Sequence, residues 1–179
     1  QLQQELALYA IRMLTVLVGA ALLFASAGAA AQDEFSLRDR ASRALTAVMP
    51  DRVQTREADG EITTIQGDWR RVPYEVRGRQ GWFPVHVLVN AGSGHALVGT
   101  LGEGAAQAGP RSRARALLES QLPGQWQLEP VADRAIEGVG LHEVLVEAGR
   151  GQGSGKRLLT VYLGEGFALR GALRGPQGS

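Results

Sequence analysis

The amino-acid sequence predicts an α+β fold of two tandem repeats, each with one helix packed on a three- or four-stranded antiparallel sheet. Two pairs of similar segments carry this prediction. GSGHALVGTLG (residues 92–102) is matched by GEGFALRGALR (164–174), and RASRALTAVMP (40–50) is matched by RARALLESQLP (113–123). The offsets are 72 and 73 residues, and a nearly constant offset at separate landmarks is typical of a duplicated unit. Chance similarity in an Ala-, Gly- and Arg-rich sequence is the alternative.

Residues 1–31 are expected to be a targeting segment outside the fold. The apolar run from Leu14 to Phe24 is shorter than the roughly 20 residues of a membrane-spanning helix but suits a signal peptide. Ala29-Ala30-Ala31 gives the small-x-small pattern that precedes a cleavage site, here before Gln32. An uncleaved membrane anchor is the alternative, although Arg12 interrupts the longer apolar stretch. Both interpretations place residues 32–179 outside the cytoplasm, and we expect them to be periplasmic or secreted.

The first predicted repeat covers residues 32–104 and begins with a helix. Ser36 and Asp39 resemble a capping box at its start, and Pro50 ends it because the residue before a proline is pushed out of the helical region. The apolar residues between them recur at helical spacing: Leu37, Ala41, Ala44, Leu45 and Val48.

Short alternating segments follow this helix and predict antiparallel strands. They are residues 61–67, 73–78, 84–90 and 95–101, and Gly92 and Gly94 turn the chain between the last two. Each repeat has such a Gly-x-Gly turn, which supplies the backbone freedom that a tight hairpin needs.

The second predicted repeat covers residues 105–179. Its helix starts near Pro110, where the missing N–H costs little, and Pro123 stops it. Strands are expected at residues 140–148, 157–163 and 167–173. A repeat of this size buries a marginal core by itself, so the two could share a face, and either a continuous sheet or a two-fold-like pair remains open.

Composition excludes several functional classes. The 179-residue chain has a formal net charge of +1, so no strong global field indicates nucleic acid or an acidic partner. Cysteine is absent, which excludes disulfides, thiolate zinc sites and cysteine nucleophiles. No cofactor and no metal are expected.

The motifs do not indicate an enzyme. His86, His95 and His142 are the only histidines, and their spacing matches no metal-binding motif. The segment GRGQGSGK (residues 149–156) lacks the first glycine of a phosphate-binding loop and precedes a strand. A hydrolase or transferase with a cryptic site between the repeats is kept as an alternative, which a pocket lined by these histidines and carboxylates would favour.

The candidate partner-binding residues form an aromatic and basic cluster in the first repeat. Tryptophan and arginine together are typical anchors of binding surfaces, and stacking on a partner is physically possible. The competing interpretation is that the aromatic residues fill the core. The predicted site comprises Trp69, Arg70, Arg71, Trp82 and Phe83.

Two segments resemble small exported modules of the cystatin-like shape. PYEVRGRQGWFPVHVLVNAGSGHALVG (residues 73–99) resembles the PepSY-type pattern, and LTVYLGEGFALRGAL (159–173) after LPGQWQLEPV (122–131) is similar to the N-terminal dimerisation domain of periplasmic disulfide isomerases. ALVGTL (96–101) with RARALLESQLPGQW (113–126) is similar to BON-type domains. The resemblance implies binding or assembly modules. It transfers no site residue, and redox activity does not carry over because CxxC is absent.

Together these observations predict an exported, non-enzymatic binding or assembly module of the cell envelope. The expected partner is an envelope protein or peptide, or a lipid or cell-wall surface, and nucleic acid is not expected. A self-associating structural subunit, in which sheet edges pair between copies, is the third alternative.

Overall fold

The computed structural model describes residues 33–102, 108–151 and 155–176. The chain separates into two compact units, Gln1–Ser36 and Leu37–Ser179, and all the strands described below and α2 belong to the second. Residues 33–48 are helical, and the part of this first helix from Leu37 onward belongs to the second unit. The predicted targeting segment, residues 1–31, lies outside the described residues. So do residues 103–107 of the predicted boundary between repeats.

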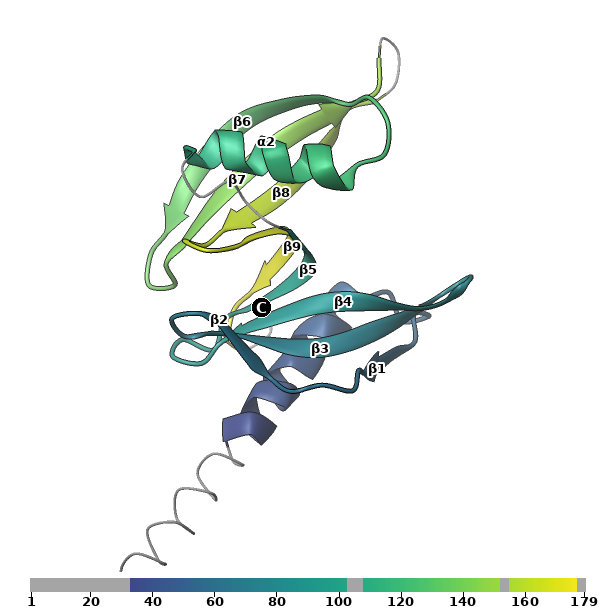
Figure 1. The fold of residues 1–179 in the computed structure, drawn as a ribbon, viewed down its shortest axis with the longest axis vertical. Helices are drawn as coiled ribbons and strands as arrows, with labels where there is room; N and C mark the ends of the chain where they lie inside the picture. The colour runs from purple at the N-terminus through teal and green to yellow at the C-terminus, as the bar shows by residue number, and fades with distance from the viewer. Residues whose placement is uncertain (1–32, 103–107, 152–154, 177–179) are drawn as a thin grey trace, which may run out of the picture. The chain divides into compact units, whose positions relative to one another are not determined.

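The described residues of the second unit form one antiparallel sheet of nine strands (Figure 1). The strand order is β1-β3-β4-β5-β9-β8-β7-β6, and β2 also pairs with β3. The elements are β1 (Thr55–Glu57), β2 (Thr63–Gln66), β3 (Trp69–Gly78), β4 (Gly81–Asn90), β5 (Ala96–Gly102), α2 (Pro110–Gln121), β6 (Gln127–Ile136), β7 (Leu141–Gly149), β8 (Arg157–Leu163) and β9 (Ala168–Arg174).

The predicted fold class is therefore wrong. The chain does not form two helix-on-sheet repeats with a sheet each, because β5 pairs with β9 over seven residues from Ala96↔Arg174 to Gly102↔Ala168. This pairing joins all the strands into a single sheet. The physical reason is that an isolated four-stranded sheet leaves unpaired backbone groups at both edges, whereas pairing β5 with β9 satisfies two of those edges at once.

Gly99 and Gly171 lie opposite each other at the centre of the β5–β9 pair. A Cβ added at Gly99 would lie 2.7 Å from the Cα of Gly171, and a Cβ at Gly171 would lie 2.8 Å from the Cα of Gly99. Neither glycine has a positive φ, so both positions require a missing side chain rather than backbone freedom. The two backbones approach so closely here that any added side chain would have to push the strands apart.

The first helix and α2 cover one face of the sheet, one on each half (Figure 1). The first helix ends before Pro50, and α2 has Pro110 in its first turn and stops before Pro123. Under the first helix the buried cluster is Ala41, Ala44, Leu45, Val72, Tyr74, Val87, Val89, Ala96 and Val98. Under α2 it is Ala114, Leu117, Leu118, Leu128, Val144, Val146, Ala148, Val161, Leu163 and Ala168.

A third cluster lies on the opposite face and joins the two halves of the sheet. Successive residues of a strand point to opposite faces, so the strand residues that alternate with the helix-covered ones meet here. The Trp69 ring packs edge-on against Phe167, with ring centroids 6.1 Å apart, and its Nε1–H donates to the Val139 carbonyl at 3.2 Å. The cluster comprises Trp69, Leu88, Leu97, Val139, Leu141, Tyr162, Phe167 and Leu169.

We expect Gly99→Ala and Gly171→Ala each to lower the free energy of unfolding by about 1–3 kcal/mol, because an added methyl group must push the two central strands apart. Urea denaturation measures this change. Gly155→Ala is the matched control, since a Cβ there meets nothing within 4 Å. If the two central variants were as stable as this control, the close approach of β5 and β9 would not be required.

Candidate partner-binding surface on the β3–β4 hairpin

Strand alternation divides the five predicted partner-binding residues between the two faces of the sheet. In the β3–β4 register Val76 faces Phe83 and Arg77 faces Trp82, and paired residues share a face. Arg70 and Phe83 therefore lie on the helix-covered face, and Trp69, Arg71 and Trp82 lie on the other. The five residues do not form one continuous surface.

Trp69 needs a correction, because its side chain is not available to a partner. It is 4% exposed, lies in the cluster that joins the two halves of the sheet and donates its indole N–H to Val139. The prediction that Trp69 binds a partner is therefore wrong, and its side chain fills the core instead. Arg70 is directed to the local backbone, where its Nη1 donates to the Gly67 carbonyl at 2.6 Å.

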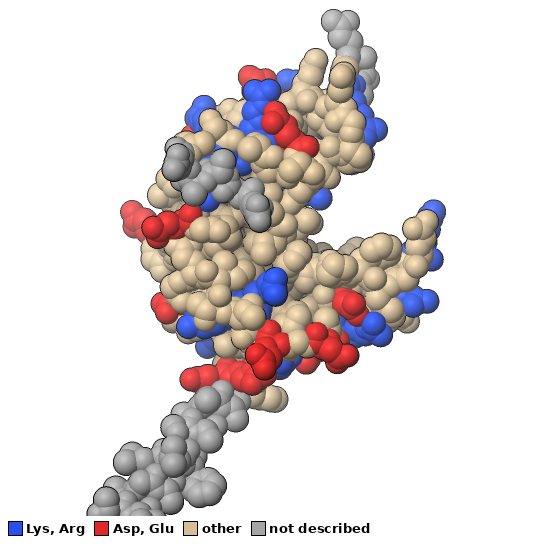
Figure 2. All heavy atoms as spheres, viewed as in Figure 1, with Lys and Arg blue, Asp and Glu red and all other residues tan. Residues whose placement is uncertain are grey.

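The residues at the end of the hairpin do form a cluster. Figure 2 shows Lys and Arg side chains gathered at the far end of the arm that β3 and β4 form. The Trp82 ring has the guanidinium Cζ of Arg56 at 4.2 Å and that of Arg77 at 5.6 Å from its centroid, which is the geometry of a cation–π interaction. We call this region the hairpin-end surface and define it as Arg56, Arg77, Arg79, Trp82 and Phe83.

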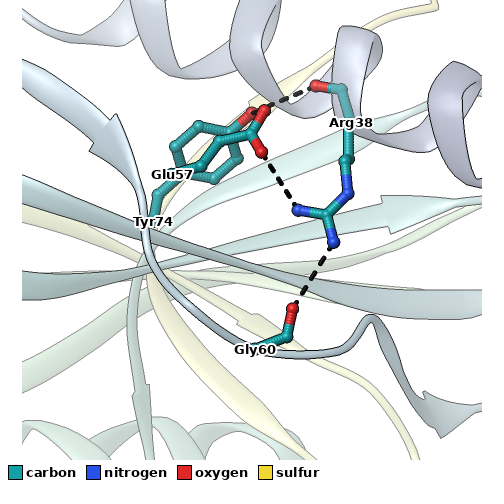
Figure 3. A network of polar contacts seen from close by, with 4 residues as sticks. All are labelled: Arg38, Glu57, Gly60 and Tyr74. Carbon is teal, nitrogen blue, oxygen red and sulfur yellow. Dashed lines mark hydrogen bonds and ion pairs between the residues drawn. The ribbon is translucent and has the colours of Figure 1, made fainter.

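Arg56 reaches Trp82 because β1 is fixed to the first helix from the other face. Figure 3 shows Arg38, whose Nη1 donates to Glu57 at 3.1 Å and whose Nη2 donates to the Gly60 carbonyl at 3.4 Å. The Tyr74 hydroxyl donates to the Arg38 carbonyl at 3.1 Å. Burial, together with the Glu57 charge, raises the pKa of Tyr74. With Glu57 held on the helix side, Arg56 faces the opposite side, where Trp82 lies.

The cations of the hairpin-end surface are only partly neutralised. Arg56 pairs with Glu75 at 2.6 Å. Among the described residues, Arg77 and Arg79 form no ion pair. A patch with two uncompensated guanidinium groups beside an indole ring is suited to an anionic group.

Phe83 is the exposed aromatic residue on the other side of the hairpin end. It is 47% exposed, and its ring lies directly on Gly78, where an added Cβ would be 2.6 Å from Cε2 of the ring. The Phe83 ring thus occupies the space beside the turn that a side chain at residue 78 would otherwise fill. The sequence pattern identified Trp82 and Phe83. It did not identify Arg56, because β1 lies far from β4 in the sequence and only the sheet brings them together.

The three histidines are not brought together. His86 accepts the backbone N–H of Leu101 at Nδ1, 3.3 Å away, and burial, with the nearby Arg71 charge, lowers the pKa of His86. The Nδ1 atom of His95 lies 3.0 Å from the Ser93 hydroxyl, and the Nε2 atom of His142 lies 3.9 Å from Asp133. The described residues contain no group of His, Asp and Glu side chains that could hold a metal ion.

One open pocket is lined in part by a histidine and by carboxylate side chains. It has a volume of about 490 Å³, and its lining includes Arg113, Glu137, His142 and Glu165. A second pocket, of about 470 Å³, lies between the end of α2 and the start of β6. There the Arg150 guanidinium lies 4.5 Å from the centroid of the Trp126 ring, a pair that the sequence analysis did not identify.

Comparison with protein-family models, with curated proteins and with solved structures finds no match. The resemblance to cystatin-like exported modules therefore stays a prediction. Among the residues that the structure describes, no helix has the length and apolar character needed to cross a membrane.

We expect Trp69→Ala to lower the free energy of unfolding by about 3–5 kcal/mol, the usual loss for a buried tryptophan. Trp82→Ala should cost less than half as much, because Trp82 lies at the end of a hairpin and packs on arginine side chains. Urea denaturation of both variants checks the difference. An equal loss in the two would make Trp82 a core residue and remove it from the candidate surface.

Stability at high pH should depend on Tyr162. Burial first, and then the Glu143 charge, raises the pKa of Tyr162 to about 12, whereas a tyrosine in the unfolded chain titrates near 10. Its contribution is fully present below about pH 10 and is lost as the pH rises from about 10 towards 12. In Tyr162→Phe, the free energy of unfolding should fall less over this range than in the wild type, as measured by urea denaturation at each pH. Equal slopes would contradict the assignment.

Proposed function

We propose that the protein is a non-enzymatic binding module that holds an anionic partner on its hairpin-end surface. The observation that carries the proposal is the partly exposed Trp82 ring beneath the Arg56 and Arg77 guanidinium groups. A tryptophan and several arginines at one exposed position supply both contact area and bidentate donors for carboxylate or phosphate. The sequence of residues 1–31 supports an exported module of the cell envelope.

The charge of this surface is local rather than global. The whole chain carries a net charge of +1, so attraction at long range is weak. Arg77 precedes the turn of the β3–β4 hairpin and Arg79 is part of that turn, and the nearby carboxylate of Glu75 is already paired with Arg56. Selectivity for an anion therefore comes from this one end of the sheet.

A pocket lined by His142, Glu137 and Glu165 has the composition that the enzyme alternative requires, but the residues that line it all belong to the second predicted repeat and not to a site between the repeats. A histidine beside carboxylates is the composition of a general acid–base site. The nearest carboxylate that pairs with His142 is Asp133, at 3.9 Å, which is beyond hydrogen-bond distance. Asp133 also accepts a hydrogen bond from Arg111 at 2.6 Å. The binding function has the stronger geometric support.

The free edge of β6 bears on the self-association alternative. Within the described part of the chain, β6 pairs with β7 alone, so its outer edge could pair with another copy. Pro130 and the adjacent bulge interrupt this edge, as in many protected edge strands. In a two-fold antiparallel pair centred on the middle of β6, Val131 and Ala132 would lie opposite each other beside Pro130, which has no backbone N–H to donate.

The double variant Arg77→Ala/Arg79→Ala tests the proposed function. Binding of the full chain is measured against two anionic probes, soluble poly-L-glutamate and phosphatidylglycerol vesicles. We expect the variant to bind about thirty-fold more weakly to whichever probe the wild type binds, from about 1 kcal/mol for each arginine.

The control removes the same charge elsewhere. Arg115→Ala/Arg157→Ala takes one arginine from α2 and one from β8, and should bind nearly as tightly as the wild type. The proposal fails if the wild type binds neither probe, or if the control loses as much affinity as the hairpin variant.

A further inference from the structure

We infer that the anionic partner is a lipid surface, and that the end of the β3–β4 hairpin inserts into its headgroup layer. This inference rests on the proposed function and specifies the partner of the same hairpin-end surface. The membrane is identified by its chemistry alone, as a layer of phosphate headgroups above acyl chains.

The two aromatic side chains at the hairpin end point away from each other. Trp82 and Phe83 are consecutive residues of β4, so they point to opposite faces of the hairpin. Phe83 is 47% exposed on the helix-covered face, and Trp82 carries its two arginines on the other. A protein docked on one face of the sheet would cover only one of these rings. A fluid layer that surrounds the hairpin end covers both.

The side chains at the hairpin end have the chemistry of a membrane interface. Arg77 and Trp82 lie opposite each other next to the turn, and Phe83 lies one residue further along β4, opposite Val76. Arginine binds phosphate through two parallel hydrogen bonds, tryptophan prefers the interface between headgroups and acyl chains, and phenylalanine has no polar atom to satisfy. Basic residues beside an anionic leaflet gain about 1 kcal/mol each.

Between the two strands, the backbone of the hairpin end is paired as far as the turn. The β3–β4 register continues to Gly78↔Gly81, whereas the outer side of β4 pairs with β5 only from His86 to Val89. On the outer side of β3, the backbone N–H of Arg77 is paired as well, because it donates to the Gln54 carbonyl at 2.8 Å. Unpaired backbone groups make entry into the hydrocarbon of a membrane costly, so the open outer side of β4 before His86 limits the insertion to the hydrated headgroup layer. Figure 1 shows this hairpin end projecting beyond β1.

The test uses tryptophan fluorescence and vesicles of phosphatidylcholine and phosphatidylglycerol whose acyl chains carry bromine, a quencher at short range. The full-length Trp126→Phe variant keeps Trp82 and the buried Trp69. The full-length Trp82→Phe variant keeps Trp126 and Trp69 and is the matched control. We expect the vesicles to quench the emission of Trp126→Phe and to leave that of Trp82→Phe unchanged. Vesicles of brominated phosphatidylcholine alone should quench neither.

Both variants keep the apolar run Leu14–Phe24, so attachment through that run is common to them and the difference between them reports the ring of Trp82. A parallel titration with poly-L-glutamate distinguishes failure of the lipid inference from failure of the proposed anion-binding function. If poly-L-glutamate shifts the emission of Trp126→Phe while the vesicles leave it unquenched, the lipid inference is overturned and the proposed binding function stands. If neither probe changes the emission, both are overturned. Equal quenching of Trp126→Phe and Trp82→Phe would also overturn the insertion of the hairpin.

Discussion

The close approach of Gly99 and Gly171 is the constraint on which the rest of the structure depends. At this point two backbones occupy the space that side chains would need, and the β5–β9 pairing that they allow converts two groups of strands into one sheet. A larger residue at either position would separate the strands at the middle of their ladder. The sheet then would have two further exposed edges, which natural proteins avoid.

Joining the strands also decides what each face of the sheet can bury. The helix-covered face holds two separate apolar clusters, one under each helix. The opposite face brings residues of both halves into a single cluster around Trp69 and Phe167. A tryptophan that the local sequence presents as a binding anchor is thereby used for packing. The end of the β3–β4 hairpin lies outside all three clusters, so its aromatic and basic side chains stay available to a partner.

The sequence pattern located the helices and several hairpins because these depend on neighbouring residues. Helical spacing and the prolines placed both helices, and alternation with glycine turns placed the strands at residues 84–90 and 95–101 and at 157–163 and 167–173. The sequence pattern did not predict β1 or β6. β1 has only three residues, and β6 carries Pro130, a bulge and charged residues, a composition that favours an edge strand but shows no clean alternation.

The sequence by itself determined the local elements, the absence of cysteine chemistry and the presence of Trp82 and Phe83 in a basic segment. Only the tertiary structure decided that the strands share one sheet, that Trp69 is buried and that Arg56 lies on Trp82. The physical reason is that local propensity acts through residues a few positions apart, whereas strand order and burial depend on partners far away in the chain. Gly171 lies 72 residues after Gly99, and the local sequence around either glycine does not predict that their backbones lie side by side.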